Sequence, residues 1–376
     1  MARARDQDAC PGALQLHRAA DGALARLRLP GGMITPRQLE AIADAATRFG
    51  SPAMELTSRG NIQIRGIADD RAAAGVADAV AQAGLLPSPT HERVRNIVSS
   101  PLSGRLGGRA DVRPWVGMLD AAICADPALA ALPGRFWFSI DDGRGDVSGL
   151  GSDVGVHVLD DTVALLLAGR DTGIRIAPSD VAPTLVSIAH RFAETRGTAW
   201  RVSELADPSV LVGDRAPSAD PGRTWPAVTR PQVGWLVQDD GRIALGAAVP
   251  LGVLQARVAE FLAAVDAPLV VTPWRSVLLC DLEEGVADTA LRVLAPMGLI
   301  FDETSPWLDV SACTGSPGCD RSIADVRADA ARAVDDIAAV HRHFVGCERA
   351  CGSPPDGDVL IATADGYVLR TPPPVG

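Results

Sequence analysis

Four cysteines near the C-terminal end constrain this 376-residue chain more than any other feature. They form two pairs, Cys313 with Cys319 and Cys347 with Cys351, separated by 27 residues. Four thiolates are the usual ligand set of a [4Fe-4S] cluster. The spacing therefore predicts that residues from different parts of the chain fold around one metal cluster.

The segment between the two pairs predicts a helix. Ser322 and Asp325 resemble a capping box, and apolar residues follow at three- and four-residue steps. The stripe consists of Ile323, Val326, Ala330, Val334, Ile337 and Val340. A chain that doubles back after this helix would return the second cysteine pair to the first.

Two other interpretations of the cysteines stay open. Structural zinc also takes four cysteines, but its pairs are usually separated by two to four residues, whereas these are separated by five and three. Two disulfides would need an oxidising compartment, which nothing in the sequence indicates. The ligand chemistry favours the iron–sulfur cluster.

The composition narrows the class of protein. The net charge is −11 and there is no polybasic run, which argues against nucleic-acid and anionic-membrane partners. No apolar run approaches the roughly 18 residues that span a bilayer, and the first residues show no hydrophobic signal region. We therefore expect a cytoplasmic protein.

An internal repeat organises the chain. Residues 22–67 predict strand, helix and strand: Thr35, Pro36 and Gln38 start the helix, and Gly50 ends it. A second helix is predicted at about 70–83, ending at Gly84. The same pattern returns about 210 residues later, where the strand Thr272 to Leu282 matches the strand Thr57 to Ile67.

Further matches extend the repeat. A four-residue match, Gly75 to Asp78 with Gly285 to Asp288, supports the same alignment. The segments that follow each copy, 95–104 and 308–318, also resemble one another, but only the second contains cysteine. One copy is therefore expected to hold a cluster that the other lacks.

These repeats predict an α+β fold of four domains and a linker. Two ferredoxin-like half-domains alternate with two core domains that are related by internal duplication. The predicted half-domains are 1–90 and 230–302, the core domains are 91–205 and 303–376, and a Pro-, Gly- and Asp-rich linker covers 206–229.

The arrangement resembles the sulfite/nitrite reductase superfamily over nearly the whole chain. Thr57-Ser58-Arg59 resembles the family's Thr-x-Arg strand, which faces an acidic tetrapyrrole, and Arg95-Asn96 resembles its second basic contact. Leu132 to Trp137 resembles a Leu-Pro-Arg-Lys-x-Lys stretch, but Arg135 is its only remaining cation and Trp137 replaces the last polar position. This departure argues against sirohaem and anion reduction.

Within the superfamily, the chain resembles the precorrin-3B synthases of aerobic cobalamin biosynthesis. The resemblance lies in Leu29 to Met33, Met54 to Ile67, Arg275 after Thr272-Pro-Trp, and the compact Cys347-Glu-Arg-Ala-Cys351. It implies an oxidoreductase, a monooxygenase that hydroxylates precorrin-3A with dioxygen and closes a γ-lactone. A [4Fe-4S] cluster and a mononuclear non-haem iron are implied as cofactors, and a reductase partner would supply NADH-derived electrons.

Binding a polyanionic macrocycle requires cations on rigid elements. The expected substrate-binding residues are Arg59, Arg65, Arg95, Arg135 and Arg275, with Gln63 on the same polar strand face. Catalytic residues and iron ligands cannot be named from the sequence. The alternatives are a sirohaem-dependent sulfite or nitrite reductase, which shares fold and cluster, and a non-catalytic iron–sulfur electron carrier.

Overall fold

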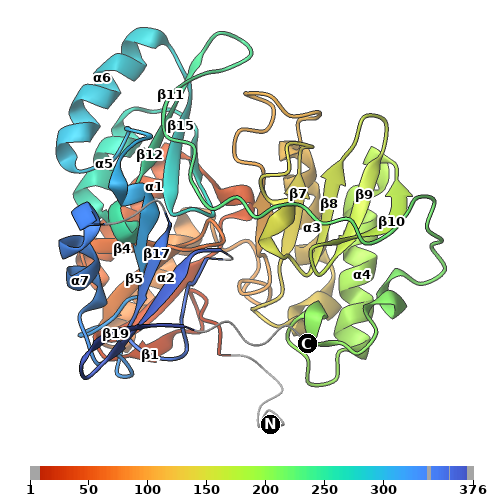
Figure 1. The fold of residues 1–376 in the computed structure, drawn as a ribbon, viewed down its shortest axis with the longest axis horizontal. Coiled ribbons are helices and arrows are strands. Elements are labelled where there is room, and N and C mark those ends of the chain that lie inside the picture. The colour runs from red at the N-terminus through yellow and green to blue at the C-terminus, as the bar shows by residue number, and fades with distance from the viewer. Residues whose placement is uncertain (1–8, 337–339, 355, 371–376) are drawn as a thin grey trace.

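The computed structural model describes residues 9–336, 340–354 and 356–370. Figure 1 shows two lobes, of which one contains both copies of the repeat and the cysteines, and the other contains the residues between the copies. No helix in the described residues is long and apolar enough to cross a membrane.

The first copy of the repeat forms the predicted elements. Thr35 caps helix α1 with a complete capping box, in which Gln38 is the third helical residue, and Gly50 follows the last turn. Antiparallel strands run in the order β1-β2-β5-β4. The elements are β1 (His17–Ala19), β2 (Gly22–Leu27), α1 (Pro36–Phe49), β4 (Ala53–Leu56), β5 (Ile62–Ile67) and α2 (Asp70–Gln82).

The second copy repeats this order and exchanges strands with the first. Strand β3 (Met33–Ile34) of the first copy pairs with β14 of the second, and β13 of the second pairs with β4 of the first. Helices α1 and α5 pack together, so the two copies share one hydrophobic core. The elements are β11 (Gly234–Val237), β12 (Ile243–Ala248), β13 (Val253–Gln255), α5 (Ala256–Ala264), β14 (Leu269–Val271), β15 (Ser276–Leu282) and α6 (Glu284–Leu294).

The predicted continuous strands Thr57 to Ile67 and Thr272 to Leu282 are wrong at their starts. The chain turns at residues 57–60 between β4 and β5, and at 272–275 between β14 and β15. In each turn the threonine N–H donates to the backbone four residues on, Asn61 or Ser276. Arg59 and Arg275 therefore lie in turns, not strands, because Gly60 in the first segment and Pro273 in the second favour a chain reversal.

The four-residue match of Gly75 to Asp78 with Gly285 to Asp288 does not reflect structural equivalence. The strands before them align with an offset of 215 residues, from Thr57 to Thr272, whereas the match has an offset of 210. Val76 is buried in α2, but Val286 is 44% exposed in α6. The two segments therefore face different surroundings, and this part of the repeat is coincidental.

The remaining two sheets share one topology. In each, the first three strands are parallel and the next is antiparallel. The other lobe holds β6 (Ile97–Ser99), α3 (Arg113–Ala125), β7 (Phe138–Asp141), β8 (Val154–Val158), β9 (Val163–Leu167), β10 (Arg170–Ile176) and α4 (Val181–Thr195). The cysteine region holds β16 (Val310–Ala312), α7 (Val326–Arg332), β17 (Arg342–Val345), β18 (Asp358–Thr363) and β19 (Gly366–Leu369).

The helix between the cysteine pairs is shorter than predicted. Helix α7 begins after Asp325, whose side chain accepts from the Ala328 N–H, and Ser322 instead donates to the Ala324 carbonyl. Val326, Ala330 and Val334 are buried, but Ile323 and Val340 are exposed, and Ile337 lies outside the described residues. Periodicity therefore identified the buried face but extended it too far at both ends.

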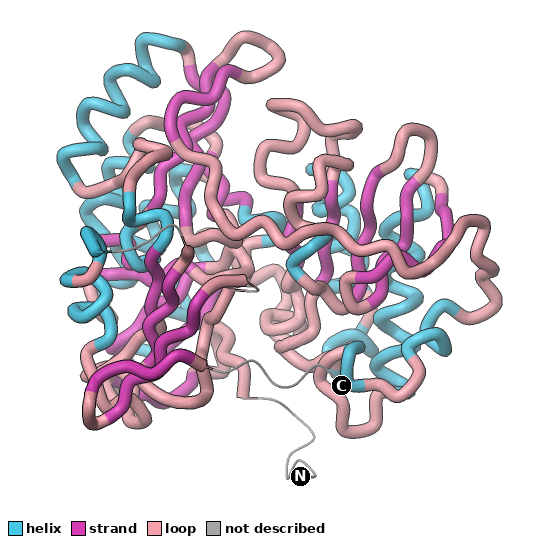
Figure 2. Tube along the Cα trace, in the orientation of Figure 1, coloured by secondary structure: helices cyan, strands magenta, loops and turns pink. Residues whose placement is uncertain are grey.

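A long loop connects the lobes. Residues 213–233 cross the molecule from the lobe that contains β10 to strand β11 without regular secondary structure (Figure 2), and they overlap the predicted linker, 206–229. The Trp225 ring lies 4.4 Å from the His157 ring, and the Trp274 indole N–H donates to the Val228 carbonyl. These contacts hold the loop against both lobes.

Gly32→Ala should destabilise the fold more than an ordinary glycine substitution. Gly32 has φ +70°, and an added Cβ would lie 2.0 Å from the Val271 carbonyl oxygen, beside the β3–β14 pairing. Gly84→Ala is a matched control, because Gly84 has φ +71° with open space around it. The control should lose about 1–2 kcal/mol from left-handed strain alone. Equal thermal midpoints for the two variants would contradict the close approach.

Candidate functional site

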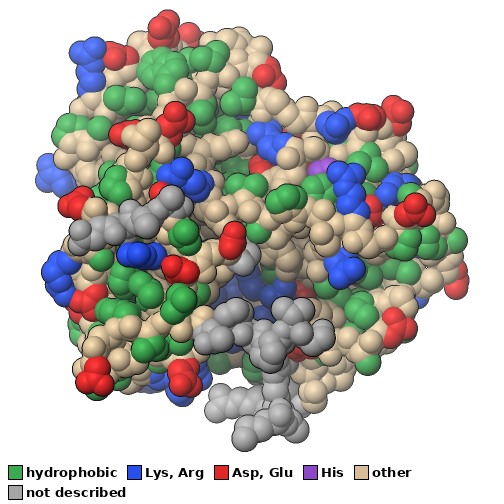
Figure 3. Space-filling view, in the orientation of Figure 1, with side chains coloured by type: hydrophobic (Ala, Val, Ile, Leu, Met, Phe, Trp, Pro, Cys, Tyr) green, Lys and Arg blue, Asp and Glu red, His purple; other side chains and the backbone are tan. Residues whose placement is uncertain are grey.

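A cavity lies where the two repeat copies meet the cysteine region. Its two adjoining parts have volumes of about 290 and 270 Å³, and both are lined by Arg59, Arg275 and Gly352. Figure 3 shows basic side chains within a hollow between the lobes. Because the turns 57–60 and 272–275 occupy equivalent places in the repeat, the cavity lies between two related turns.

Arg59 points a cation into this cavity. Its guanidinium carbon lies 5.6 Å from the centre of the Trp137 ring, a cation–π geometry. Burial, together with the charge of Arg201, lowers the pKa of Arg59 to about 10, so it remains protonated at neutral pH. No carboxylate of the described residues forms an ion pair with it.

Arg275 reaches the cavity from the second copy. It has φ +55° and occupies the turn position that Gly60 takes in the first copy. Its Nη2 donates to the Gly352 carbonyl at 2.9 Å, and burial and Arg327 lower its pKa. Trp137, Trp274 and Trp307 line the same part of the cavity, so the cations lie beside broad apolar walls.

Gln63 and Arg65 are engaged with other protein groups. Gln63 accepts from Arg26 and donates to Glu55 at 2.9 Å, within the smaller part of the cavity. Arg65 forms a two-point ion pair with Asp21 at 2.8–2.9 Å and also donates to the Gly318 carbonyl. Arg65 thus ties the first copy to the cysteine loop, and its predicted role in substrate binding stays a prediction.

Arg95 and Arg135 do not line the cavity. Arg95 makes two 2.7 Å hydrogen bonds to Asp120 and one to the Leu85 carbonyl, inside the other lobe. Arg135 is exposed, 5.2 Å from the Trp200 ring. The structure therefore separates these two arginines from Arg59 and Arg275.

The four cysteines converge at one edge of their sheet. Strands β16 and β17 are parallel neighbours, so Cys313 and Cys347, which follow them, leave the same edge. The Gly346 N–H donates to the Cys313 sulfur at 3.4 Å. Burial and the charges of the neighbouring Cys313, Cys347 and Cys319 raise the pKa of Cys351.

The four thiols fit an iron–sulfur cluster by the chemistry of their donors. Cys313, Cys319, Cys347 and Cys351 provide four thiolates, the usual ligand set of a [4Fe-4S] cluster. Structural zinc takes the same donors, so iron and sulfide content distinguishes the two.

Two histidines lie near the cysteines, His343 within β17 and His341 just before it. His343 lies in β17 and is fully buried, and its Nε2 lies 3.0 Å from the Cys351 carbonyl. Ser311 Oγ lies 2.7 Å from His343 Nδ1 and 2.8 Å from His341 Nε2. Ser311 and His341 also line the cavity.

The sequence reasoning missed several basic residues, among them Arg201 and Arg28. Arg201 lines the cavity and makes a 2.7 Å ion pair with buried Asp153. Arg28, the residue after β2, is buried, and among the described residues two of its guanidinium nitrogens have no hydrogen-bond partner. Burial, with the charge of Arg26, lowers its pKa to about 9. Arg28 immediately precedes the Leu29-to-Met33 stretch that carried the family resemblance, which was the available signal.

The cavity does not fit a mononuclear iron site. Non-haem iron of the common type takes two histidines and one carboxylate. Among the described residues, His341 is the only histidine lining the cavity, and Glu55, paired with Arg327 and Gln63, the only carboxylate. We therefore derive no chemistry through such an iron.

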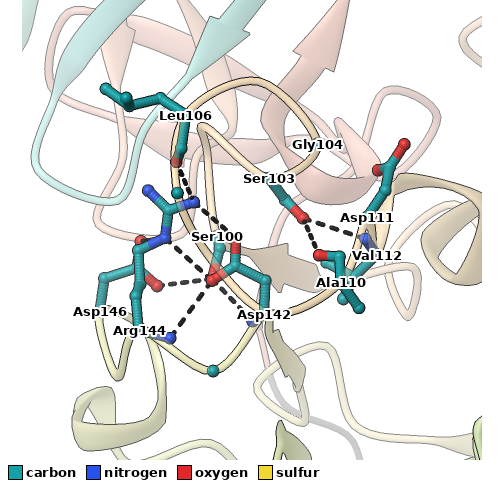
Figure 4. A network of polar contacts seen from close by, with 12 residues as sticks. Ser100, Ser103, Gly104, Leu106, Ala110, Asp111, Val112, Asp142, Arg144 and Asp146 are labelled. Atoms are coloured by element: carbon teal, nitrogen blue, oxygen red, sulfur yellow. Dashed lines mark hydrogen bonds and ion pairs between the residues drawn. The ribbon is translucent and has the colours of Figure 1, made fainter. Parts of the chain in front are cut away.

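An acidic corner in the other lobe occupies the place equivalent to the cysteines. The Ser100 N–H donates to Ile140 after β6, as the Cys313 N–H donates to Phe344 after β16. Figure 4 shows Ser100 beside Asp142, Arg144 and Asp146. Arg144 makes hydrogen bonds of 2.9 and 2.6 Å to Asp142, so a guanidinium already provides the positive charge in this corner.

Comparison with known proteins agrees with this architecture. Residues 17–81 match the nitrite/sulfite reductase ferredoxin-like half domain. The chain has the fold of the Mycobacterium tuberculosis NirA protein, with a TM-score of 0.75 and 18% identity over 92% of this chain and 73% of NirA. The chain therefore contains a nitrite/sulfite reductase ferredoxin-like half domain and shares its fold with NirA.

Two relatives match this chain over nearly its full length. A precorrin-3B synthase of Sinorhizobium sp is 27% identical over 96% of this chain and 82% of its own length. The chloroplastic ferredoxin–nitrite reductase of Zea mays is 25% identical over 92% of this chain and 71% of its own length. The comparisons therefore confirm the predicted ferredoxin-like half-domain and fold, and the relatives include both of the enzyme types considered from the sequence.

Arg59→Gln and Arg275→Gln should each weaken binding of an acidic tetrapyrrole about ten- to a hundredfold, because each removes a shielded charge-assisted hydrogen bond. Arg135→Gln is the comparison variant, since that side chain lies outside the cavity lining. The measurement is an anaerobic fluorescence titration with precorrin-3A. Weakening by Arg135→Gln alone would move the binding site away from this cavity.

Asp146→Asn should change the pH dependence of stability. Burial, and then Asp141, raises the pKa of Asp146 from 3.8 to about 7 in the folded state. The folded chain therefore holds the extra proton, and stability falls as pH rises from about 4 through about 7. The variant should lose this fall in urea unfolding at pH 5 and 8. Asp161→Asn, at an exposed site, should keep it.

Proposed function

We propose that this chain is an oxidoreductase of the precorrin-3B synthase type. It would hydroxylate precorrin-3A with dioxygen and close a γ-lactone. The observation that carries the proposal is the cavity, whose larger part is lined by Arg59, Arg201 and Arg275 and, among the described residues, by no Asp or Glu. Such a lining suits a ligand that brings its own carboxylates.

The cavity residues have separate roles in this proposal. Arg59 and Arg275 bind carboxylates from the two related turns, and the tryptophans pack against the macrocycle faces. The turns are fixed by backbone hydrogen bonds and by the exchanged strands, so the cations are held in place before the ligand binds.

The cysteines would hold a [4Fe-4S] cluster beside the substrate. Cys313 and Cys351 line the smaller part of the cavity, so electrons would travel a short path to the bound macrocycle. When bound, the cluster would supply electrons one at a time. Hydroxylation with release of water consumes one dioxygen, two electrons and two protons, so a reductase partner carrying NADH-derived electrons is required.

The alternative is a sirohaem-dependent sulfite or nitrite reductase, which the Zea mays relative favours. The oxygenase is supported instead by the loss of cations from the stretch that is expected to hold sirohaem and its anion in the reductases. Arg135 is exposed, and Trp137, 5% exposed, forms part of the cavity wall where the reductases have a basic or polar residue. An electron carrier would need no such cavity.

Protein purified under anaerobic conditions should contain about four iron and four sulfide per chain. Its spectrum should show broad iron–sulfur absorption without haem bands, even after expression with a sirohaem supply. With precorrin-3A, a reductase and dioxygen, it should form the hydroxylated lactone, followed by mass spectrometry. The same protein should not oxidise a reduced dye with sulfite or nitrite.

Other outcomes would contradict the proposal at separate points. Stoichiometric sirohaem with nitrite- or sulfite-dependent dye oxidation would establish the reductase instead. Bound zinc without sulfide would show that the cysteines hold no iron–sulfur cluster. Cys347→Ser should lower the iron and sulfide content because it removes a cluster ligand. Cys124→Ser is its control, since Cys124 lies in α3 of the other lobe and its replacement should leave the iron content unchanged.

A further inference from the structure

A chain of hydrogen bonds leads from the cavity wall to the cysteine loop. His341 and Ser311 line the cavity, Ser311 faces His343 across the paired strands β16 and β17, and His343 faces the Cys351 carbonyl. The three heavy-atom distances are 2.8, 2.7 and 3.0 Å. All three are within normal hydrogen-bond range.

The partners fix the direction of this chain. A carbonyl only accepts, so His343 Nε2 must carry a proton. His343 is fully buried, and its two hydrogen-bond partners are a hydroxyl and a carbonyl, so the ring is neutral and Nδ1 is left as an acceptor. Ser311 therefore donates to His343, and its oxygen accepts from His341 Nε2. The Ser311 hydroxyl has one proton, so it can donate only one hydrogen bond.

We propose that Ser311 and His343 position the Cys351 loop and tune the reduction potential of the cluster, and that Ser311 links this potential to occupancy of the cavity. The inference rests on the proposed function for its cluster and ligand. Hydrogen bonds and solvent exposure around the ligands set the potentials of such clusters. A ligand carboxylate that accepts the hydrogen bond of the Ser311 hydroxyl would leave His343 Nδ1 without that donor. The hydrogen bond from His343 Nε2 to the Cys351 carbonyl would then weaken.

The residues act through Cys351 and are positioning residues. An N–H dipole near the cluster stabilises its more negative, reduced state, so losing the dipole should lower the midpoint potential. His343→Leu removes the donor outright, and Ser311→Ala removes the group that fixes the His343 proton. Ser311→Thr keeps the hydroxyl and should restore the wild-type value.

The test is a potentiometric titration of the cluster, followed by electron paramagnetic resonance, on the full chain. His343→Leu should shift the one-electron equilibrium at least tenfold toward the oxidised cluster, about 59 mV. Ser311→Ala should shift it in the same direction, and Ser311→Thr should not. Phe344→Leu is the matched control, because Phe344 lies in the same strand but packs in the apolar core of the region.

The second part of the titration adds precorrin-3A without dioxygen. The potential of the wild type should change, and that of Ser311→Ala should not. Unchanged potentials in His343→Leu and Ser311→Ala, with full iron and sulfide content, would overturn the proposal, as would equal shifts in Phe344→Leu. If precorrin-3A does not bind while the ligand-free shifts appear, the proposed substrate fails and the tuning stands.

If His343→Leu does not retain a cluster, His343→Gln is the second variant, because its amide can still donate to the carbonyl. A wild-type midpoint potential in His343→Gln, together with a lowered midpoint potential in Ser311→Ala, supports the proposed chain of hydrogen bonds. A wild-type potential in both of these variants contradicts it.

Discussion

The exchange of strands between the two copies is the constraint on which the rest of the structure depends. Strand β3 completes the second sheet and β13 completes the first, so neither copy has a finished sheet or a separate core. The contact is close enough that Gly32 leaves no room for a Cβ against Val271. The exchange brings the turns that carry Arg59 and Arg275 to one cavity, which residues far apart in sequence then line together.

Local signals predicted the elements that local chemistry controls. The capping box of Thr35 and Gln38, the helix end at Gly50 and the duplication are all present as expected. The turns at 57–60 and 272–275 were missed, because alternating residues on both sides suggested one strand. The length of α7 was overestimated, because periodicity says which residues share a face and not where the backbone leaves the helix.

The roles of the arginines could not be predicted, because distant acids decide them. Arg65 pairs with Asp21, 44 residues away, and Arg95 with Asp120, 25 residues away. Nothing in the local sequence separates these arginines from Arg59 and Arg275. The cysteines were easier to interpret, since equivalent positions after parallel strands converge whatever the intervening chain does.

The two duplicated sheets carry different side chains at the same backbone position. Where Cys313 begins the thiol site, the other lobe has Ser100, with Asp142, Asp146 and Arg144 around it. A buried charge must find an opposite charge or hydrogen bonds, and Arg144 supplies both inside the acidic corner.

The same rule separates the arginines of the chain into two groups. Those with carboxylate partners, such as Arg65 and Arg95, hold elements together, whereas Arg59 and Arg275 have no such partner among the described residues and keep their charge in the cavity. Burying a cation without an opposite charge costs stability, so the fold carries that cost at the cavity, where an anionic ligand would offset it.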